Sequence, residues 1–388
     1  ETGQKSLMFY TSDNGTIKLS GGTLNATIKG GTDPSNRGTA FYYEAPGATY
    51  GTFDNTTISS YAATTFGGTL GNLRLNMEAG SRLFVASNVS MNLSDTNPTG
   101  ISAALGLGGL TGSNYKTFML YLSELVVNHS VDLNDPNSAY NQLEIANSSI
   151  KNADTITGTN NRQVAMAQEN GMDTSGITGY QASKVTLTNT ATGTITMTGT
   201  KAVGMAAKKG NITNSGTLNM TGAEQGVGMF GDVSGTLTNN GTISTGDAAT
   251  ESALRIGMFT TNAGVGIVNN GTINAGKNSY GIYGKNVTTN NGSVFNIGEN
   301  GVGIFSKATQ SVPTSTDNIT INAGTTFNIG NENAVGVFTE NDSAGIQITD
   351  NGSTMHIGNN SYGYVFKGQN TKFSNTVASN ATIGQNSV

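Results

Sequence analysis

The sequence predicts an all-β protein whose fold is a right-handed parallel β-helix, or β-solenoid, with insertions. Three observations predict this fold: a repeat punctuated by glycines, short alternating segments between those glycines, and a low apolar content. Self-similarity with a period of about 20–50 residues is typical of architectures in which identical units stack on one another. The repeat is therefore the first element to justify.

The repeat occurs seven times in residues 185–366, and each unit contains three glycines. The first glycine follows an Asn or Thr corner in most units, and a second glycine comes five or six residues later. The third begins a Gly-apolar-aromatic motif in most units. The first glycines are Gly193, Gly216, Gly241, Gly271, Gly292, Gly324 and Gly352, and the third glycines are Gly204, Gly228, Gly257, Gly281, Gly303, Gly336 and Gly363.

The segments between the glycines are typical of strands. They are four to six residues long, too short for most helices, and Thr194–Met197 alternates threonine with apolar residues. Gly and Asn tolerate positive φ at corners, as at Asn270 and Gly271. One coil per repeat would stack parallel strands. We expect inward ladders of Ile, Val, Met and aromatic side chains, with Asn and Thr in corner or outward ladders; the aromatics are Phe230, Phe259, Tyr283, Phe305 and Phe338.

The composition fits a solenoid and excludes several function classes. Of the 388 residues, 35% are apolar and 11% charged, below the averages of roughly half and a quarter for globular domains. The absence of cysteine removes disulfide scaffolds and thiol catalysis. The net charge of −5, without basic clusters, disfavours nucleic-acid binding. The two histidines, His129 and His356, lie too far apart in sequence to suggest a metal site or catalytic triad.

Three parts are expected along the chain. Residues 1–3 are an artificial remnant left after removal of a secretion signal, residues 4–184 an irregular amino-terminal solenoid with insertions, and residues 185–388 the regular β-helix repeats.

Near residues 115–128, apolar residues such as Tyr115, Phe118 and Leu122 recur at helical spacing, so we expect one short helix there. The alternative is a buried strand over residues 118–131.

Two repeat units are stretched, by residues 247–254 and 306–317. Insertions in solenoids map to loops, often on the binding side. The candidate ligand-binding residues lie in these protrusions and in the segment around residue 115. They are Tyr115, Lys116, Glu251, Arg255, Lys307 and Gln310.

Apparent catalytic motifs are explained by the repeat. The near P-loop at residues 271–278 lacks the final hydroxyl residue, and the Gly-x-Gly-x-x-Gly at residues 226–231 has no helix after it. Two acidic pairs remain, Glu340 with Asp342 and Asp132 with Asp135, but both lie in Asn-rich, turn-like contexts. We therefore expect no enzyme activity, no cofactor and no metal.

The corner Asn-Gly-Thr-Ile followed by Gly-apolar-aromatic resembles the passenger repeats of large fusobacterial type V autotransporter adhesins, of the arginine- or galactose-inhibitable type. Matching stretches are Gly281-Ile-Tyr-Gly284 and Gly301-Val-Gly-Ile-Phe305. The resemblance is strong over residues 185–366 and weaker, in the same style, over residues 4–184.

This resemblance implies a monomeric passenger on the bacterial cell surface, held at the outer membrane only by a carboxy-terminal barrel that these residues do not include. Its partners would be host-cell receptors, protein or glycan, or other bacteria, and not nucleic acid. Two alternatives stay open: a structural stalk whose binding region lies elsewhere, and a polysaccharide-cleaving β-helix enzyme.

Overall fold

The computed structural model describes residues 6–12, 15–33, 36–45, 70–93, 103, 105–136, 138–168, 185–308, 317–341, 345–368 and 371–388. The chain divides into two compact units. The first contains residues 1–131, 135–151 and 168–185, and the second residues 132–134, 152–167 and 186–388. Each is described by itself below.

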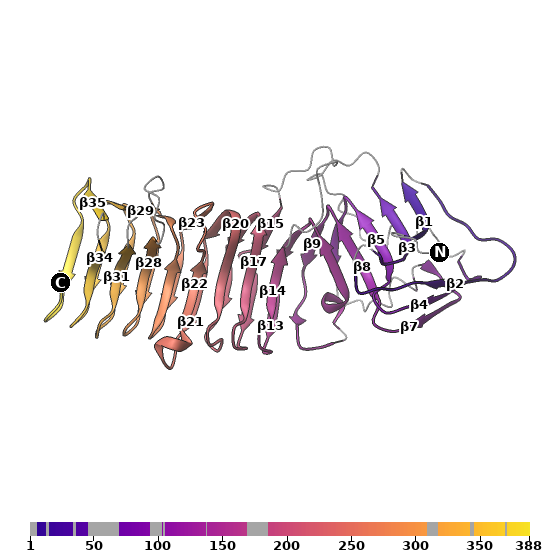
Figure 1. Ribbon diagram of the computed structural model, residues 1–388, viewed down its shortest axis with the longest axis horizontal. Coiled ribbons are helices and arrows are strands. Elements are labelled where there is room, and N and C mark those ends of the chain that lie inside the picture. Colours follow the sequence, from indigo (N-terminus) through magenta and orange to yellow (C-terminus); the bar gives the residue numbers. More distant parts are fainter. Residues whose placement is uncertain are drawn as a thin grey trace. The chain divides into compact units, whose positions relative to one another are not determined.

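The second unit is built from three parallel sheets, and every coil adds one strand to each of them (Figure 1). The first sheet contains β14 (Val164–Gln168), β17 (Val203–Lys209), β20 (Val227–Asn239), β22 (Arg255–Phe259), β25 (Ser279–Tyr283), β28 (Val302–Ala308), β31 (Val335–Asn341) and β34 (Tyr362–Gly368). The second contains β15 (Thr186–Asn189), β18 (Asn211–Asn214), the end of β20, β23 (Val265–Asn269), β26 (Asn286–Thr289), β29 (Asp317–Asn322), β32 (Ile346–Asn351) and β35 (Thr371–Asn375). The third contains β13 (Thr155–Gly158), β16 (Thr194–Met197), β19 (Thr217–Asn219), β21 (Thr242–Gly246), β24 (Thr272–Ala275), β27 (Val294–Ile297), β30 (Thr326–Ile329), β33 (Thr354–Ile357) and β36 (Asn380–Ile383).

The first unit has the same parallel character. One sheet contains β1 (Leu7–Ser12), β3 (Thr39–Glu44), β5 (Arg82–Ser87), β8 (Lys116–Tyr121) and β11 (Leu143–Ala146). Another contains β2 (Leu24–Ile28), β4 (Leu73–Met77) and β7 (Gly109–Gly112), and β6 (Ser90–Leu93) pairs with β9 (Glu124–Val127). Other elements of the described residues are β10 (Val131–Asp132), β12 (Ser149–Asn152) and the 3₁₀ helix η3 (Ala139–Gln142), and the second unit contains the 3₁₀ helix η5 (Glu251–Ala253).

The predicted right-handed parallel β-helix is confirmed, because equivalent residues of successive coils lie in register. Ile195 pairs with Leu218, Leu218 with Ile243 and Ile243 with Ile273, and all four are fully buried. Further along the same ladder, the rings of Phe295 and Phe327 stack with centroids 4.8 Å apart. One file of apolar residues per strand therefore supplies the core.

Asparagines form a second ladder inside the solenoid, at the corner between the second and third sheets. The side-chain amide of each asparagine donates a hydrogen bond to the amide oxygen of the next one, at 2.8–2.9 Å. All of them are fully buried. The corner position was expected, whereas the complete burial was not. The members are Asn152, Asn189, Asn214, Asn239 and Asn269.

The third glycine of each repeat has a steric role within the first sheet. It is the second residue of β17, β20, β28, β31 and β34 and lies inside β22 and β25, so it belongs to the strand itself. A Cβ added at Gly281 would lie 2.6 Å from the carbonyl oxygen of Gly303, and at Gly303 2.6 Å from that of Gly336. Real Cβ contacts of this length essentially never occur. Glycine recurs here because the next coil occupies the space of a side chain.

The expected helix near residues 115–128 is wrong. Residues 116–121 form β8, which pairs in parallel with β5 and β11, and residues 124–127 form β9. Leu122 has φ of 48°, which turns the chain between these strands. Thr117 to Leu120 are all buried, as in a strand covered on both faces, and such a run imitates helical spacing. The alternative strand over residues 118–131 is closer, although it is broken at Leu122.

Replacing one of the third glycines of the repeat tests the close contact between successive coils. Gly281→Ala should lower the free energy of unfolding by about 1–3 kcal/mol, because the backbone of the next coil must move to admit a methyl group. Gly266→Ala in β23 is the matched control, since its new Cβ would meet nothing closer than 3.8 Å. Denaturant unfolding followed by circular dichroism measures both, and equal effects would contradict the steric explanation.

Candidate ligand-binding face

The outer surface of the first sheet carries a row of aromatic side chains. In β25 and β28, Ile282 and Ile304 point into the core and are fully buried, so the next residues, Tyr283 and Phe305, point to the opposite side. These outer residues form an apolar cluster of their own. We call it the aromatic face, and its members are Tyr280, Tyr283, Val302, Phe305, Val335, Phe338 and Val365, extended by Phe230 and Phe259.

Ring contacts make the aromatic face continuous over five coils. The centroids of Phe230 and Phe259 are 5.6 Å apart, those of Phe259 and Tyr283 5.2 Å, and those of Tyr283 and Phe305 4.9 Å. Phe338 continues the row 5.3 Å from Phe305. Offset and edge-to-face pairs at these separations stabilise each other beyond the area they bury. The face is therefore a pre-ordered apolar surface.

The expectation that these aromatics point inward is wrong. The sequence signal that places them outside is the order Gly-apolar-aromatic: if the apolar residue faces the core, strand alternation sends the aromatic one outward. The inward position is taken instead by Met229, Met258, Ile282, Ile304 and Val337, which are fully buried. Met, Ile and Val fill the interior in these coils. Among the outer rings, Phe305 is buried against its neighbours, and the others remain partly exposed.

Charged side chains border the aromatic face. Glu340 of β31 lies between two lysines of neighbouring coils, with Nζ of Lys367 at 3.2 Å and Nζ of Lys307 at 3.6 Å. The hydrogen bond from Lys367, together with Lys307, lowers the pKa of Glu340. Burial raises the pKa of Tyr280, and the carboxylates of Glu251 and Glu340 raise it further. The negative charges of Glu251 and Glu340 therefore both act on the hydroxyl of Tyr280.

Two of the sequence-predicted residues, Glu251 and Lys307, each lie at this border, at opposite ends of the strands of the first sheet. Glu251 is exposed in η5 and acts electrostatically on Tyr280, and Lys307 stands two residues after Phe305 in β28. Arg255 is different: it is 6% exposed, and its guanidinium donates to the carbonyl oxygens of Thr221 and Thr245. The prediction that Arg255 lies in a protrusion is wrong, because it braces a corner.

The inserted residues 247–254 also pack more closely than a simple protrusion. Ala248 and Ala253 are buried, and the carboxylate of Asp247 accepts a hydrogen bond from the backbone of Lys277 at 2.7 Å. Lys307 likewise belongs to a strand. Gln310 lies outside the described residues.

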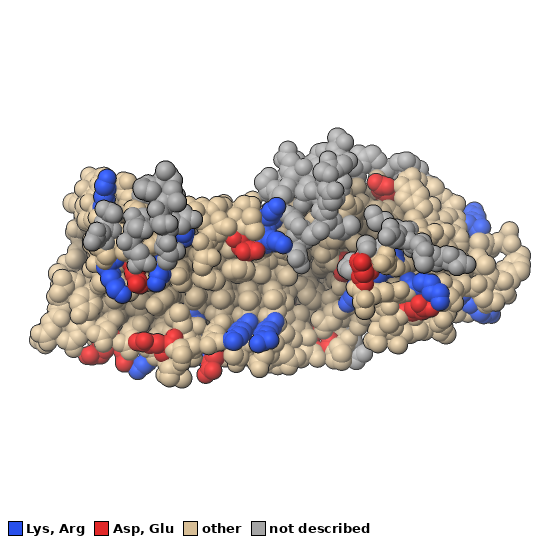
Figure 2. All heavy atoms as spheres, in the orientation of Figure 1, with Lys and Arg blue, Asp and Glu red and all other residues tan. Residues whose placement is uncertain are grey.

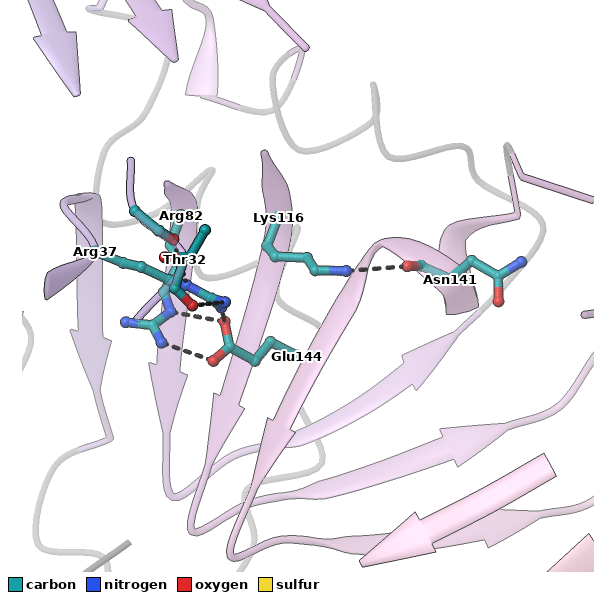
Figure 3. Close-up of polar contacts among 7 residues, drawn as sticks. Thr32, Arg37, Arg82, Lys116, Asn141 and Glu144 are labelled. Atoms are coloured by element: carbon teal, nitrogen blue, oxygen red, sulfur yellow. Dashed lines mark hydrogen bonds and ion pairs between the residues drawn. The ribbon is translucent and has the colours of Figure 1, made fainter. Parts of the chain in front are cut away.

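Tyr115 and Lys116 belong to the first unit, and Lys116 stands beside a cluster of ion-paired side chains (Figure 3). Lys116 donates to the carbonyl oxygen of Asn141 at 3.4 Å and pairs in register with Arg82. The carboxylate of Glu144 accepts hydrogen bonds of 2.7–3.0 Å from Arg82 and Arg37. The three paired side chains are each less than one-fifth exposed, so this cluster holds the first unit together.

Two of the acidic residues that could suggest catalysis, Asp132 and Glu340, have structural partners. Asp132 accepts from the backbone and side chain of Asn134 at 2.9 and 2.8 Å, which closes a local turn. Glu340 is paired with the two lysines, and Asp342 lies outside the described residues. Among the residues that the structure describes, no group of three or more His, Cys, Asp or Glu side chains could hold a metal ion.

Asp350 is a further carboxylate with structural partners, and it is almost completely buried. It is 1% exposed in β32 and accepts four hydrogen bonds of 2.7–3.0 Å, from the hydroxyls of Tyr364 and Ser353 and the backbone of Ser353 and Gly352. Burial by itself raises the pKa of Asp350, but these hydrogen bonds outweigh it and lower the pKa. A saturated, ionised carboxylate is a structural anchor rather than a general acid.

The visible surface is mostly uncharged. Figure 2 shows lysines, arginines and acids in small separate groups among other residues, with no broad basic area on the face shown. No helix in the described part of the chain is long and apolar enough to cross a bilayer.

Comparison with known proteins identifies one relationship. Residues 6–289 match the family described as BigA third pectate lyase-like domain. No curated protein and no solved structure matches the chain.

Asp350→Asn should destabilise the protein at neutral pH, and the loss should disappear in acid. A carboxylate with a lowered pKa stabilises the fold above its unfolded-state pKa of about 3.9, and this contribution is lost as the pH falls through the folded-state pKa. Denaturant unfolding at pH 7, 5, 4 and 3 should therefore give a difference between wild type and variant that shrinks below about pH 4. A difference independent of pH would contradict the role of the charge.

Proposed function

Because this chain belongs to the family of the BigA third pectate lyase-like domain, a domain of an autotransporter adhesin, we propose that it is a surface-exposed passenger that attaches a bacterium to other cells. We propose further that the aromatic face binds a protein receptor, on a host cell or on a partner bacterium. The single observation that carries this proposal is the continuous row of ring contacts on the outer side of the first sheet, in which Phe230, Phe259, Tyr283 and Phe338 remain partly exposed.

The composition of the face favours a protein partner. Aromatic residues at the centre of a surface, with polar and charged residues around them, are typical of protein–protein interfaces. Tyr280, Tyr283 and Phe338 supply rings at the centre, and Glu251 and Lys307 lie at the border. Rings of this kind usually contribute most of the binding free energy, whereas charges at the rim govern specificity and the rate of association.

Rigidity favours binding at this face as well. Its residues lie on strands whose neighbours in both directions are held by parallel ladders, so little conformational entropy is lost when a partner binds. The glycine contacts beneath the rings fix the spacing between coils. An adhesin that must hold under load benefits from a surface that does not rearrange.

Removing two rings tests the proposal. In the double variant Tyr283→Ala with Phe338→Ala, attachment of the purified chain to receptor-bearing cells should weaken at least about 30-fold, because central aromatic anchors each contribute on the order of 2 kcal/mol. Binding is measured by surface titration on intact cells. The matched control is Thr213→Ala with Thr238→Ala on the second sheet, which should bind like the wild type.

The same experiment separates the alternatives. If the ring variant folds, as judged by circular dichroism, and attaches like the wild type, the aromatic face is not the adhesive site. If deletion of residues 247–254 also leaves attachment unchanged, the structural-stalk alternative is favoured. Turnover of a polysaccharide by the purified chain would favour the enzymatic alternative.

A further inference from the structure

A groove of about 560 Å³ runs along the outer side of the third sheet, away from the residues of the aromatic face. It crosses successive coils from β21 to β33, and its lining includes the corner glycines Gly246, Gly276, Gly298 and Gly330. Because these residues have no side chains, the backbone forms an open floor. The groove lies entirely within the second unit.

One wall of the groove is a ladder of side-chain amides. Asn274 donates to the hydroxyl of Ser244 at 3.0 Å, Asn296 to the amide oxygen of Asn274 at 2.7 Å and Asn328 to that of Asn296 at 2.8 Å. His356 follows in register after Asn328. A primary amide has two N–H donors and an oxygen with two lone pairs. Asn274 and Asn296, which both donate and accept within the ladder, therefore each keep one N–H donor and one acceptor site for a ligand. Ser244 and His356 at the two ends offer a hydroxyl and an imidazole instead.

This wall differs from the asparagine ladder of the interior in its exposure. Asn296, Asn328 and His356 are exposed, and Ser244 and Asn274 are partly so. The rungs repeat at the spacing of neighbouring strands, about 4.8 Å, and five rungs from Ser244 to His356 span ~19 Å. Its three amides offer N–H donors and oxygen acceptors at equal intervals along a line, with a hydroxyl at one end and an imidazole at the other.

The spacing selects the type of polymer. In an extended polypeptide, groups on one side recur every second residue, about 6.7 Å, which falls out of step with the rungs. The sugar rings of a linear, equatorially linked polysaccharide repeat at a distance close to the strand spacing. Successive rings of such a chain are turned over, but each ring carries hydroxyls on both edges, so every ring presents a hydroxyl to the wall. Because hydroxyls both donate and accept hydrogen bonds, each ring can meet one rung.

The charge beside the groove selects against an acidic polymer. Asp247 and Glu299 directly follow lining glycines, and Glu332 comes two residues after Gly330. Lys277 is paired with Glu299 at 2.8 Å, which leaves this edge with three carboxylates and one ammonium group. Uronate or sulfate groups would be repelled there.

We propose that this groove is a binding site for an uncharged linear polysaccharide, which lies along the coils with its hydroxyls on Ser244, Asn274, Asn296, Asn328 and His356. No lining residue carries a carboxylate that could act as a general acid or base, so the groove holds the chain without cleaving it. The site is separate from the aromatic face, and neither proposal depends on the other.

Titration calorimetry on the whole chain tests this proposal. The probes are three neutral β-1,4-linked hexasaccharides (cellohexaose, mannohexaose and chitohexaose), their trisaccharides, and hexagalacturonate. At least one neutral hexasaccharide should bind at least tenfold more tightly than its own trisaccharide, because it occupies more rungs. It should also bind at least tenfold more tightly than hexagalacturonate. Failure of all three neutral probes, or tighter binding of hexagalacturonate, overturns the proposal.

Variants locate the site. Asn296→Ala with Asn328→Ala should weaken binding of the hexasaccharide at least tenfold. Asn240→Ala with Asn270→Ala removes the same number of amides from another ladder, joined by a 2.7 Å hydrogen bond, and should leave binding unchanged. Should the first pair fail to fold, His356→Ala tests the end rung without touching the ladder, with at least a threefold loss expected. Unchanged binding in the folded groove variants places the ligand elsewhere and overturns the assignment.

Discussion

The fold depends on one constraint: the residues of each coil must lie level with the equivalent residues of the coil before it. Backbone ladders satisfy this constraint along the strands, and identical side chains satisfy it at the corners. The buried asparagines from Asn152 to Asn269 show the role of the corner side chains most clearly. Each amide finds a hydrogen-bond partner only if the neighbouring coil presents another amide at the same height. A buried amide without a partner costs free energy, so a slipped register is disfavoured at every coil.

The same constraint produces the surfaces that could bind a ligand. Stacking in register turns any residue type that recurs in the repeat into a row, whether inside or outside the solenoid. The recurring aromatic after Gly-apolar becomes the aromatic face, and the recurring Asn of the third sheet becomes the wall of the groove. Two chemically different surfaces thus arise on two sheets from one repeat. An adhesin passenger built this way can present an apolar and a polar array without any change in its backbone.

Candidate site residues were harder to predict than the fold, for identifiable reasons. The two stretched repeats were visible in the sequence, and Glu251 and Lys307 do lie beside the aromatic face. Arg255 looked like an interface anchor, but the carbonyl oxygens of Thr221 and Thr245 hold its guanidinium, and only folding brings these together. The segment from Phe118 to Val127 imitates a helix because β8 is buried on both faces, so its apolar residues do not alternate with polar ones. Whether Tyr115 and Lys116 bind a ligand stays a prediction.

The glycines and the short alternating segments were enough to predict that the chain winds into parallel coils, because each unit repeats them in the same order even though the units differ in length. The sequence also determined where the corners lie, because Gly and Asn recur there. Only the tertiary structure decided which side of each strand faces the core, and therefore that the rings of Tyr283 and Phe305 lie outside while Asn214 lies inside. The physical reason is that alternation defines two faces without saying which is buried. That choice is made by the neighbouring coils, through the carbonyl oxygens that exclude a Cβ and the amides that must pair.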